Sequence, residues 1–347
     1  MKVFRSLMVV VTVLVLLASL GGMVSAQVEP TGKLAEVLAR GKLICGTNGT
    51  LPGFSFLNAD TGEITGFDAD YCRAVAAAIF GEVTADNLQF VTVTPAERFA
   101  ALQSGQIDVL FANATSTFSR DTDLRLDAGP VIFYDGQGLM VRTSLGVASI
   151  DDLGGASFCT LTGTTTELNI TDAMKSRGLE FELIPFETST DSFSGFEAER
   201  CDVITSDKSQ LASLRSSAND PSQYLVLPDT LSKEPLAPFW LEGDEQWGNV
   251  IRWTVYATFQ AEELGLTSAT IETADVSNPT ISRFIGNEGG LGGFLGLSDD
   301  FAVKVIKAVG NYGEIYDRHI TPIGIDRAGT LNAAYTEGGL IYAPAWR

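Results

Sequence analysis

Histidine is nearly absent from this 347-residue chain, in which His319 is the only one. A Ser-His-Asp triad is therefore excluded everywhere except around that residue, and metal sites built from several histidines are excluded too. His319 ends a stretch, residues 311–319, with the pattern of a helix C-terminus, where a histidine commonly acts as a capping cation. We therefore expect no catalytic residue, no metal and no cofactor.

Long apolar runs are also scarce, and the chain has a single one, at residues 7–20. Lys2 and Arg5 precede this run, and the small residues 24–26 follow it, which is the pattern of a cleaved export signal. The run is too short for a membrane span, which needs about 20 residues. We expect residues 1–26 to be removed, so that a soluble mature chain is released into the periplasm.

Positive charge is in short supply, because the chain has 23 basic against 43 acidic residues and a net charge of −20. Removing the two positive charges of the signal leaves the mature chain with a net charge of −22. Such a surface repels nucleic acid and anionic lipid. The simplest interpretation of the charge is solubility, so it excludes nucleic acid as a partner without identifying a ligand.

Cysteine is limited to Cys45, Cys72, Cys159 and Cys201, and no two of these form a Cys-x-x-Cys pair. That absence argues against a zinc site and against a redox motif. An even number of cysteines in an exported chain favours disulfides, and four cysteines allow three pairings. Because the first two lie in the first third of the chain and the other two in its middle, we expect one bridge in each of two domains.

Strand and helix patterns alternate along the mature chain. Helical segments at residues 33–40 and 69–80 alternate with apolar strands at 42–46 and 89–93, and Asp68 stands where it can cap the second helix. Alternation at this spacing predicts parallel sheets and an α/β fold. The length that remains after the signal is sufficient for two domains.

An internal similarity relates residues 101–113 to residues 196–207. In both segments a helix ends, Asp-Val opens a buried strand, and a short polar residue, Asn113 or Asp207, stands five positions after the first aspartate. Two domains of like construction would place these two side chains at the carboxyl ends of strands, where open α/β sheets bind ligands. The alternative is chance similarity between two ordinary helix–strand junctions.

Arg120 is a candidate for binding a carboxylate, because the donors of a guanidinium match two oxygens at once. It follows a predicted strand end that carries several hydroxyl groups, among them Thr115 and Ser116, which could add a donor. The alternative is an exposed arginine paired with Asp121 or Asp123.

Two further segments suit the ends of a zwitterion. Thr164 and Glu167 form a capping box at a helix start, where free N–H groups and partial positive charge attract carboxylates, and Thr164 and Thr165 carry hydroxyls as well. Asp207 could bind an ammonium group. The alternatives are capping alone for the helix start and an ion pair with Lys208 for Asp207. Together with Arg120, these residues would form a clamp for an amino acid.

Six segments of the mature chain carry a family resemblance, namely residues 66–71, 96–105, 134–138, 162–169, 231–236 and 309–314. On these segments the chain resembles the amino-acid-binding proteins of polar amino-acid ABC importers, solute-binding protein family 3, and within them the general L-amino-acid-binding branch. The positions of the cysteines and the long C-terminal extension also resemble that branch, so the resemblance covers nearly the whole mature chain.

This resemblance implies a type II periplasmic-binding fold of two α/β lobes, joined by a two-strand hinge and followed by a helical C-terminal extension. The first lobe would hold residues 27–135 and 236–347, and the second lobe residues 136–235. The implied function is the capture of a free L-amino acid between the lobes and its delivery to the membrane permease subunits of an ABC importer. We expect the protein to act as a monomer.

The resemblance also implies roles for individual residues. Arg120 with Thr115 would hold the α-carboxylate, Thr165 would contact the same group, and Asp207 would bind the α-ammonium group. Further residues would line the cleft or the side-chain pocket, namely Asn113, Asn48, Leu51, Phe54 and Arg98.

One departure from the branch concerns Ala112, Ala114 and Ser116, where larger residues would be expected, an arginine and a tryptophan among them. This departure predicts a wider or less polar pocket and leaves the ligand's side chain open. Three other functions remain as alternatives: a dehydratase-like exported enzyme on the same fold, a sensor ectodomain, and a binder of another small anion such as an opine or a dicarboxylate.

Overall fold

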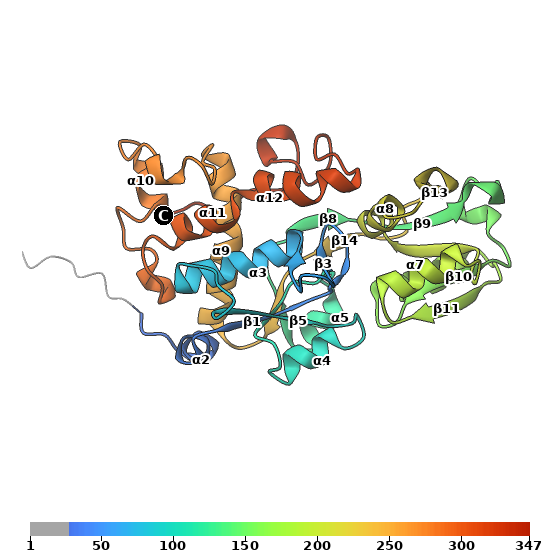
Figure 1. Ribbon diagram of the computed structural model, residues 1–347, viewed down its shortest axis with the longest axis horizontal. Helices are drawn as coiled ribbons and strands as arrows, with labels where there is room; N and C mark the ends of the chain where they lie inside the picture. The colour runs from blue at the N-terminus through green and yellow to red at the C-terminus, as the bar shows by residue number, and fades with distance from the viewer. Residues whose placement is uncertain (1–27) are drawn as a thin grey trace, which may run out of the picture.

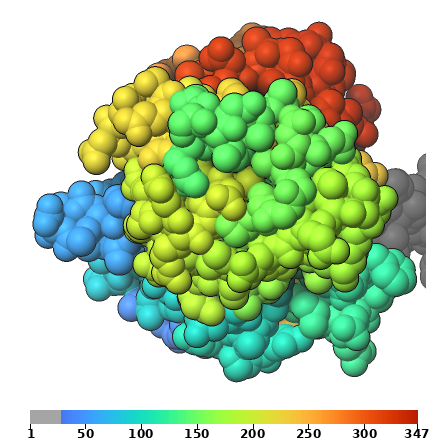
Figure 2. All heavy atoms as spheres, turned by 90° about the vertical axis from the view of Figure 1, so that its right-hand side faces the viewer, coloured from blue at the N-terminus to red at the C-terminus, as the bar shows by residue number. Residues whose placement is uncertain are grey.

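The computed structural model describes residues 28–347, so the expected signal at residues 1–26 lies outside the described part. Two α/β lobes lie side by side along the long axis of the molecule, each with its own sheet (Figure 1). Viewed along that axis, the second lobe stands in front of the first (Figure 2). The α/β class and the two-lobed architecture predicted above are confirmed.

The first lobe contains a five-stranded sheet in which β1 pairs in parallel with both β5 and β6, while β15 runs antiparallel to β6 and β7. The central strands are buried on both faces because helices cover them, as parallel sheets require. The strand order is β5 (Leu88–Thr92), β1 (Leu43–Thr47), β6 (Val109–Leu110), β15 (Phe239–Leu241) and β7 (Leu126–Ala128).

The second lobe contains a five-stranded sheet of the same kind, in which β10 pairs in parallel with both β11 and β12, and β9 runs antiparallel to β12 and β13. Its strand order is β11 (Glu182–Phe186), β10 (Ser157–Leu161), β12 (Val203–Asp207), β9 (Gln137–Arg142) and β13 (Tyr224–Val226).

Two antiparallel strands connect the lobes. They are β8 (Phe133–Asp135) and β14 (Glu234–Leu236), and their register places Glu234 opposite Asp135. Both strands lie between the two sheets in Figure 1. The chain therefore crosses from one lobe to the other and back, and this pair of strands forms the hinge.

Helix α3 (Phe67–Phe80) packs against α11 (Phe301–Val309) in the first lobe. Its N-cap is Gly66, at φ 133°, and a Cβ atom there would lie 2.2 Å from the Phe54 carbonyl oxygen, so only glycine fits. The prediction that Asp68 caps this helix was therefore wrong. Asp68 is buried in the first turn, where its carboxylate accepts a hydrogen bond from the Asn113 N–H at 2.8 Å.

The remaining helices surround the two sheets, with α10 and α12 at the upper edge of the first lobe in Figure 1. In the first lobe these are α2 (Gly32–Arg40), α4 (Arg98–Gln103), α5 (Phe118–Thr122), α9 (Glu245–Glu263), α10 (Pro279–Phe284) and α12 (Tyr312–His319). In the second lobe they are α6 (Thr165–Ser176), α7 (Ser189–Glu197) and α8 (Lys208–Ser216).

The cysteines pair as predicted. Cys45 on β1 is bonded to Cys72 on α3, and Cys159 on β10 is bonded to Cys201, just before β12. Each bridge fastens a helix or a loop to the sheet of its own lobe and closes a loop of 27 or 42 residues. In the chain-entropy model, a disulfide that closes a loop of this length stabilises the folded state by about 3–4 kcal/mol, because it restricts the unfolded chain.

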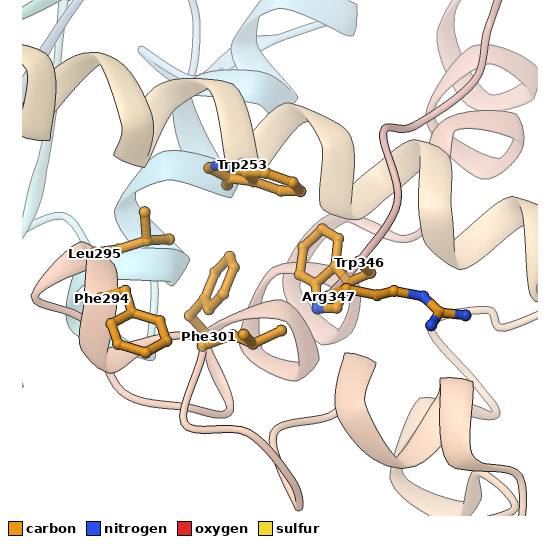
Figure 3. Close-up of a pocket in the computed structure, with 7 residues that line it drawn as sticks. Trp253, Phe294, Leu295, Phe301, Trp346 and Arg347 are labelled. Carbon is orange, nitrogen blue, oxygen red and sulfur yellow. The ribbon is translucent and has the colours of Figure 1, made fainter. Parts of the chain in front are cut away.

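The C-terminal extension is fastened to the first lobe by aromatic contacts. The Trp346 ring stacks on Phe301 at 5.8 Å between centroids and meets Trp253 and Phe284 edge-on, each at 5.1 Å. Figure 3 shows Trp346 beside Trp253 and Phe301. The tail is therefore part of the core of this lobe.

Within residues 28–347, no helix combines the length and the apolar character that crossing a bilayer requires. The same residues contain no cluster of three or more histidine, cysteine, aspartate or glutamate side chains suited to a metal ion.

Candidate ligand-binding cleft

A narrow, polar cavity lies between the two lobes. The first lobe and the second lobe both contribute polar side chains to it, and most of these stand at strand ends or helix starts. The lining residues are Asn48, Pro95, Arg98, Asn113 and Thr115 from the first lobe, and Leu161, Thr164, Thr165, Thr166, Ser206, Asp207 and Gln210 from the second.

The geometry of the two sheets explains this concentration of polar groups. Asn48 directly follows β1, and Asn113 follows β6, while Leu161 and Asp207 are the last residues of β10 and β12. The carboxyl ends of parallel strands meet at one edge of a sheet, and ligands bind outside that edge. Here the two edges face each other across the hinge.

Arg120 is buried, with 6% of its surface exposed, and no ion pair joins it to Asp121 or Asp123 among the described residues. Its Nη1 atom donates to the Thr115 carbonyl oxygen at 2.6 Å, and its guanidinium lies 4.7 Å from the centroid of the Phe99 ring. Burial is the main reason that the pKa of Arg120 falls to about 10. Arg120 therefore stands directly behind the Thr115 wall of the cavity and is not one of its lining residues.

Arg98, at the start of α4, lines the cavity itself. Its Nη1 atom donates to the Ala112 carbonyl oxygen at 3.0 Å, and its guanidinium lies 5.0 Å from the Phe99 ring centroid. Burial and, to a smaller extent, the charge of Arg120 lower the pKa of Arg98 to about 9. Two guanidinium groups thus share the Phe99 ring at one end of the cleft.

Asp207 is buried at the end of β12 and lines the opposite wall. Its pKa is raised well above the ordinary value, first by burial and then by the charges of Asp135 and Glu234. Lys208 does not pair with it, because the Lys208 ammonium group donates to the Pro228 carbonyl and to the Thr230 hydroxyl. The buried carboxyl group is therefore suited to a cation that enters the cleft.

The start of helix α6 forms the wall between these charges. Thr164 is its N-cap, and the Thr164 Oγ1 atom accepts a hydrogen bond from the Glu167 N–H at 3.2 Å. Thr164, Thr165 and Thr166 line the cavity, so the positive end of the helix dipole faces it. The Thr164 cap predicted from the sequence is present, but the capping box is incomplete, because the Glu167 carboxylate accepts from the Gly163 N–H at 3.1 Å and not from the Thr164 N–H. The helix end is directed at the ligand site.

Glu234 on hinge strand β14 is the functional residue that the sequence analysis missed. Its carboxylate accepts hydrogen bonds from Thr115 in the first lobe and from Thr165, at 2.9 Å, and Asn169, at 3.0 Å, in the second. The side chain is only 1% exposed and also accepts from Ser232. Its position inside the matching segment 231–236 was the one available signal, because no local pattern marks a buried hinge carboxylate.

This arrangement restricts what the two threonine hydroxyls can do. A hydroxyl has one hydrogen to donate, and those of Thr115 and Thr165 are both directed at Glu234. Their remaining lone pairs can only accept hydrogen bonds. A carboxylate ligand must therefore be bound by the guanidinium groups and by the first N–H groups of α6.

We expect replacement of Glu234 by alanine to loosen the closed cleft, because donors from both lobes lose their shared acceptor. Ligand affinity should fall by about tenfold to a hundredfold, since each such bond to a charged group contributes about 1.5–3 kcal/mol. At the same subsaturating ligand concentration, small-angle X-ray scattering should show a larger radius of gyration for Glu234→Ala than for wild type. Glu234→Gln, which keeps an acceptor oxygen, is the matched control. If both variants have the ligand affinity and the radius of gyration of wild type, the bridging role of Glu234 is contradicted.

Leu51 and Phe54 do not reach the cavity, contrary to the role that the resemblance implied. Leu51 belongs to β2 (Thr50–Leu51), and both side chains are buried in the core of the first lobe. The Phe54 ring packs edge-on against Phe67 and Phe133, at 6.1 and 5.4 Å. The small sheet of β2, β3 (Ser55–Leu57) and β4 (Ile64–Thr65) sets the path of the chain at this point.

Ala112 and Ala114 also lie outside the cavity lining, within an apolar cluster that includes Phe99. Ser116 is held by its backbone, whose N–H donates to the Pro235 carbonyl at 2.8 Å. The small residues at these positions therefore alter the packing behind the cavity and do not widen it directly.

Contacts between the lobes close the cleft. The Asn113 Nδ2 atom donates to Gln210 Oε1 at 3.3 Å across the cavity, and the Ser213 hydroxyl donates to the Pro52 carbonyl at 2.6 Å. Gln210 was also missed, although it lies three residues after Asp207, in the first turn of α8. The structure therefore shows the closed form of the two-lobed fold.

Comparisons with known proteins agree with this architecture. Residues 43–151 match the family model of bacterial extracellular solute-binding proteins, family 3. The chain is 44% identical to the general L-amino acid-binding periplasmic protein AapJ of Rhizobium johnstonii, over 93% of this chain and 95% of that protein. It is 45% identical to the glutamate/glutamine/aspartate/asparagine-binding protein BztA of Rhodobacter capsulatus, over 90% of this chain and 93% of that one.

Among solved structures, a periplasmic binding protein of an ABC transporter from Brucella ovis, with glutathione bound, superposes with a TM-score of 0.86. It is 43% identical and is matched over 92% of this chain and 100% of its own length. Because similarity at this level covers nearly the whole chain, this protein belongs to the bacterial extracellular solute-binding proteins of family 3.

Proposed function

We propose that this protein captures a free L-amino acid in the periplasm and delivers it to the membrane permease subunits of an ABC importer. The observation that carries the proposal is the convergence of buried guanidinium groups, a helix N-terminus and a buried aspartate on one cavity between two lobes. A zwitterion requires these three features within a few ångströms. The names of the relatives, two of which refer to amino acids, support the same conclusion.

Within this proposal, Arg120 supplies charge behind Thr115 for the α-carboxylate, and the N-terminus of α6 at Thr165 supplies N–H donors. Asp207 binds the α-ammonium group. Asn113 and Asn48, whose side chains lie 3.5 Å apart, line the first-lobe wall together with Arg98. The burial of each group strengthens these contacts, because water competes less in a closed cleft.

Closure of the cleft follows from the same arrangement. We place the lobe boundaries at residues 27–135 with 236–347 and at residues 136–235, so that the strand pair β8 and β14 serves as the hinge. Ligand bound between the lobes adds contacts that only the closed form can make, and it therefore shifts the population toward that form. A permease that recognises the closed form would then receive only loaded protein, as a monomer.

An enzyme on the same fold is the main alternative. Among the residues that line the cavity, Asp207 is the one carboxylic acid, and a clamp for an amino acid already uses it. His319 lies on α12, where its Nε2 atom is 2.7 Å from the Asp70 carboxylate, and it is not part of the cavity. The site therefore supports binding better than catalysis.

A thermal-shift screen of the refolded, ligand-stripped mature protein tests the proposal. The panel contains the twenty L-amino acids, their D-enantiomers, dicarboxylates, opines and glutathione. A ligand at a hundredfold excess over its Kd stabilises the native state by about 2.7 kcal/mol, which is a clear shift in Tm. We expect shifts with several L-amino acids and none with their D-enantiomers. A shift with an opine or a dicarboxylate alone would keep the fold and refute the proposed ligand.

A further inference from the structure

A residue of the C-terminal segment, Asn332, is bonded to the hinge. Its side chain is buried, its Oδ1 atom accepts from the Tyr134 N–H at 2.6 Å, and its Nδ2 atom donates to the Tyr134 carbonyl at 3.0 Å. Tyr134 is the middle residue of β8 and stands opposite Pro235 of β14. Alternate residues of an antiparallel strand direct both backbone groups away from the partner strand. The Asn332 amide therefore takes the place of a further strand at this edge.

The other edge of the hinge is also held by the first lobe. Thr115 forms a β-bridge with Leu236, and the Ser116 N–H donates to the Pro235 carbonyl at 2.8 Å. The pair of strands β8 and β14 is therefore fixed to the first lobe along both edges. Main-chain pairing fixes the edge of β14, whereas a side chain fixes the edge of β8.

The second lobe holds the residues that directly follow Tyr134. The Asp135 carboxylate accepts from the Ser209 N–H at 3.1 Å, and the Gly136 carbonyl accepts from the Lys208 N–H at 2.9 Å, both at the start of α8. Neighbouring residues of one strand are thus bonded to opposite lobes. Because a hinge absorbs its motion in a few backbone angles, closure must be absorbed close to Asp135.

The loop that carries Asn332 is itself firmly placed. The Asn332 carbonyl accepts from Arg327 Nε at 2.7 Å. Arg327 pairs with Glu262 on α9, with 2.9 Å between Nη2 and Oε2, and its guanidinium lies 4.8 Å from the centroid of the Tyr312 ring on α12. Two helices of the first lobe therefore fix this loop, and a side chain held in this way can restrict the strand that it bonds.

We propose that Asn332 is a positioning residue of the hinge, which confines bending to the residues after Tyr134 and so limits how far the ligand-free lobes spread. Without the amide, bending would extend back into β8 and the open form would sample wider separations. Closing from a broader ensemble costs more conformational entropy, so the binding-competent fraction falls and the apparent Kd rises. Asn332 is not among the residues that line the cavity, so this rise should be equal for every ligand.

Pulsed electron paramagnetic resonance measures the separation of the lobes in the ligand-stripped mature protein. Spin labels are attached to Glu82→Cys in the first lobe and Lys175→Cys in the second, two exposed positions, while the native cysteines are held in disulfides. We expect Asn332→Ala to give a broader distribution of distances than the same labelled protein with Asn332, extended toward larger separations. Asn332→Asp should broaden it too, because the carboxylate cannot donate to the Tyr134 carbonyl.

Asn311→Ala is the matched control for the loss of a buried amide. The Asn311 side chain also accepts from one backbone N–H, that of Glu314 at 2.9 Å, and donates to one backbone carbonyl, that of Leu266 at 2.8 Å. Both partners lie outside the hinge strands. Asn311→Ala should therefore lower Tm as Asn332→Ala does, and leave the distribution of lobe distances unchanged.

Calorimetric titration with L-glutamate and L-glutamine then tests the effect on affinity, which rests on the proposed function. Asn332→Ala should raise both Kd values by the same factor, about threefold to tenfold, the size of one neutral hydrogen bond. Asn311→Ala should leave both unchanged.

Three results would overturn the role of Asn332: distances like those of wild type in both Asn332 variants, the same broadening in Asn311→Ala, or a loss of affinity for only one of the two ligands. If Asn332→Ala does not fold, as judged by its unfolding transition, Asn332→Asp decides. If no amino acid binds wild type, the proposed function fails, and the distances in the ligand-free protein still decide whether Asn332 restrains the hinge.

Discussion

Arg120→Ala should lower the affinity for every amino acid ligand by at least about a hundredfold, whatever the side chain, because it removes the buried positive charge directly behind the Thr115 wall, beside the position proposed for the α-carboxylate. A hydrogen bond to a charged group contributes about 1.5–3 kcal/mol, and the substitution removes the donor to the Thr115 carbonyl as well as the charge. Glu234 is the largest attractive influence on the charge of Arg120, so the substitution also removes a positive charge that interacts with the buried Glu234 carboxylate. Calorimetric titration of the ligand-stripped protein measures the loss.

Two further variants make the Arg120 prediction specific. Arg120→Lys keeps the charge without the planar pair of donors and should lie between wild type and the alanine variant. Arg177→Ala removes an arginine of the second lobe that pairs with Asp151 at the surface, and it should bind like wild type. Wild-type affinity in Arg120→Ala, with an unchanged unfolding transition, would show that the α-carboxylate is held elsewhere in the cleft.

Asp207→Asn should lower affinity by about tenfold to a hundredfold, because the ammonium group would lose its anionic partner while the amide keeps one acceptor oxygen. The loss of affinity should be greater in Asp207→Ala, which leaves no hydrogen-bond acceptor for the ammonium group. The same titrations measure both variants, and Asp202→Asn is the matched control. Asp202 precedes β12 and accepts hydrogen bonds from Ser157, away from the cavity lining.

Binding should also weaken as the pH falls, and the carboxyl group of Asp207 sets the sign. Burial and the charges of Asp135 and Glu234 raise its pKa in the free cleft, while Arg98 and Arg120 oppose this rise. A bound ammonium group favours the ionised carboxylate, so the complex has the lower pKa and binding releases a proton. Affinity is therefore full above the raised pKa and declines as the pH drops through it.

Calorimetry in buffers of different ionisation enthalpy counts the released proton directly. In Asp207→Asn this proton release should disappear, because an amide does not titrate. An Asp207→Asn variant that binds with wild-type affinity and still releases the proton would contradict the assignment of the ammonium site.

The location of the candidate site could be predicted in part from strand ends. Two features together indicate the carboxyl edge of a sheet: a buried strand that opens with Asp-Val, and a polar residue five positions after that aspartate. The structure places both such residues, Asn113 and Asp207, at the cavity. The cap at Thr164 could be recognised because it depends on residues three positions apart. The same local reasoning failed for Asp68, whose carboxylate bonds to Asn113, 45 positions away, instead of to its own helix.

The sequence by itself determined the α/β class, the disulfide pairing, the family and the residue types of a zwitterion clamp, because each depends on local periodicity, on spacing or on matching segments. Only the tertiary structure decided that Leu51 and Phe54 turn into the core, that Arg98 faces the cavity without an ion pair, and that Glu234 joins the lobes. Thr115 and Glu234 are 119 positions apart and meet because the chain crosses the hinge twice. Such contacts depend on where the chain returns in space, which no local pattern encodes.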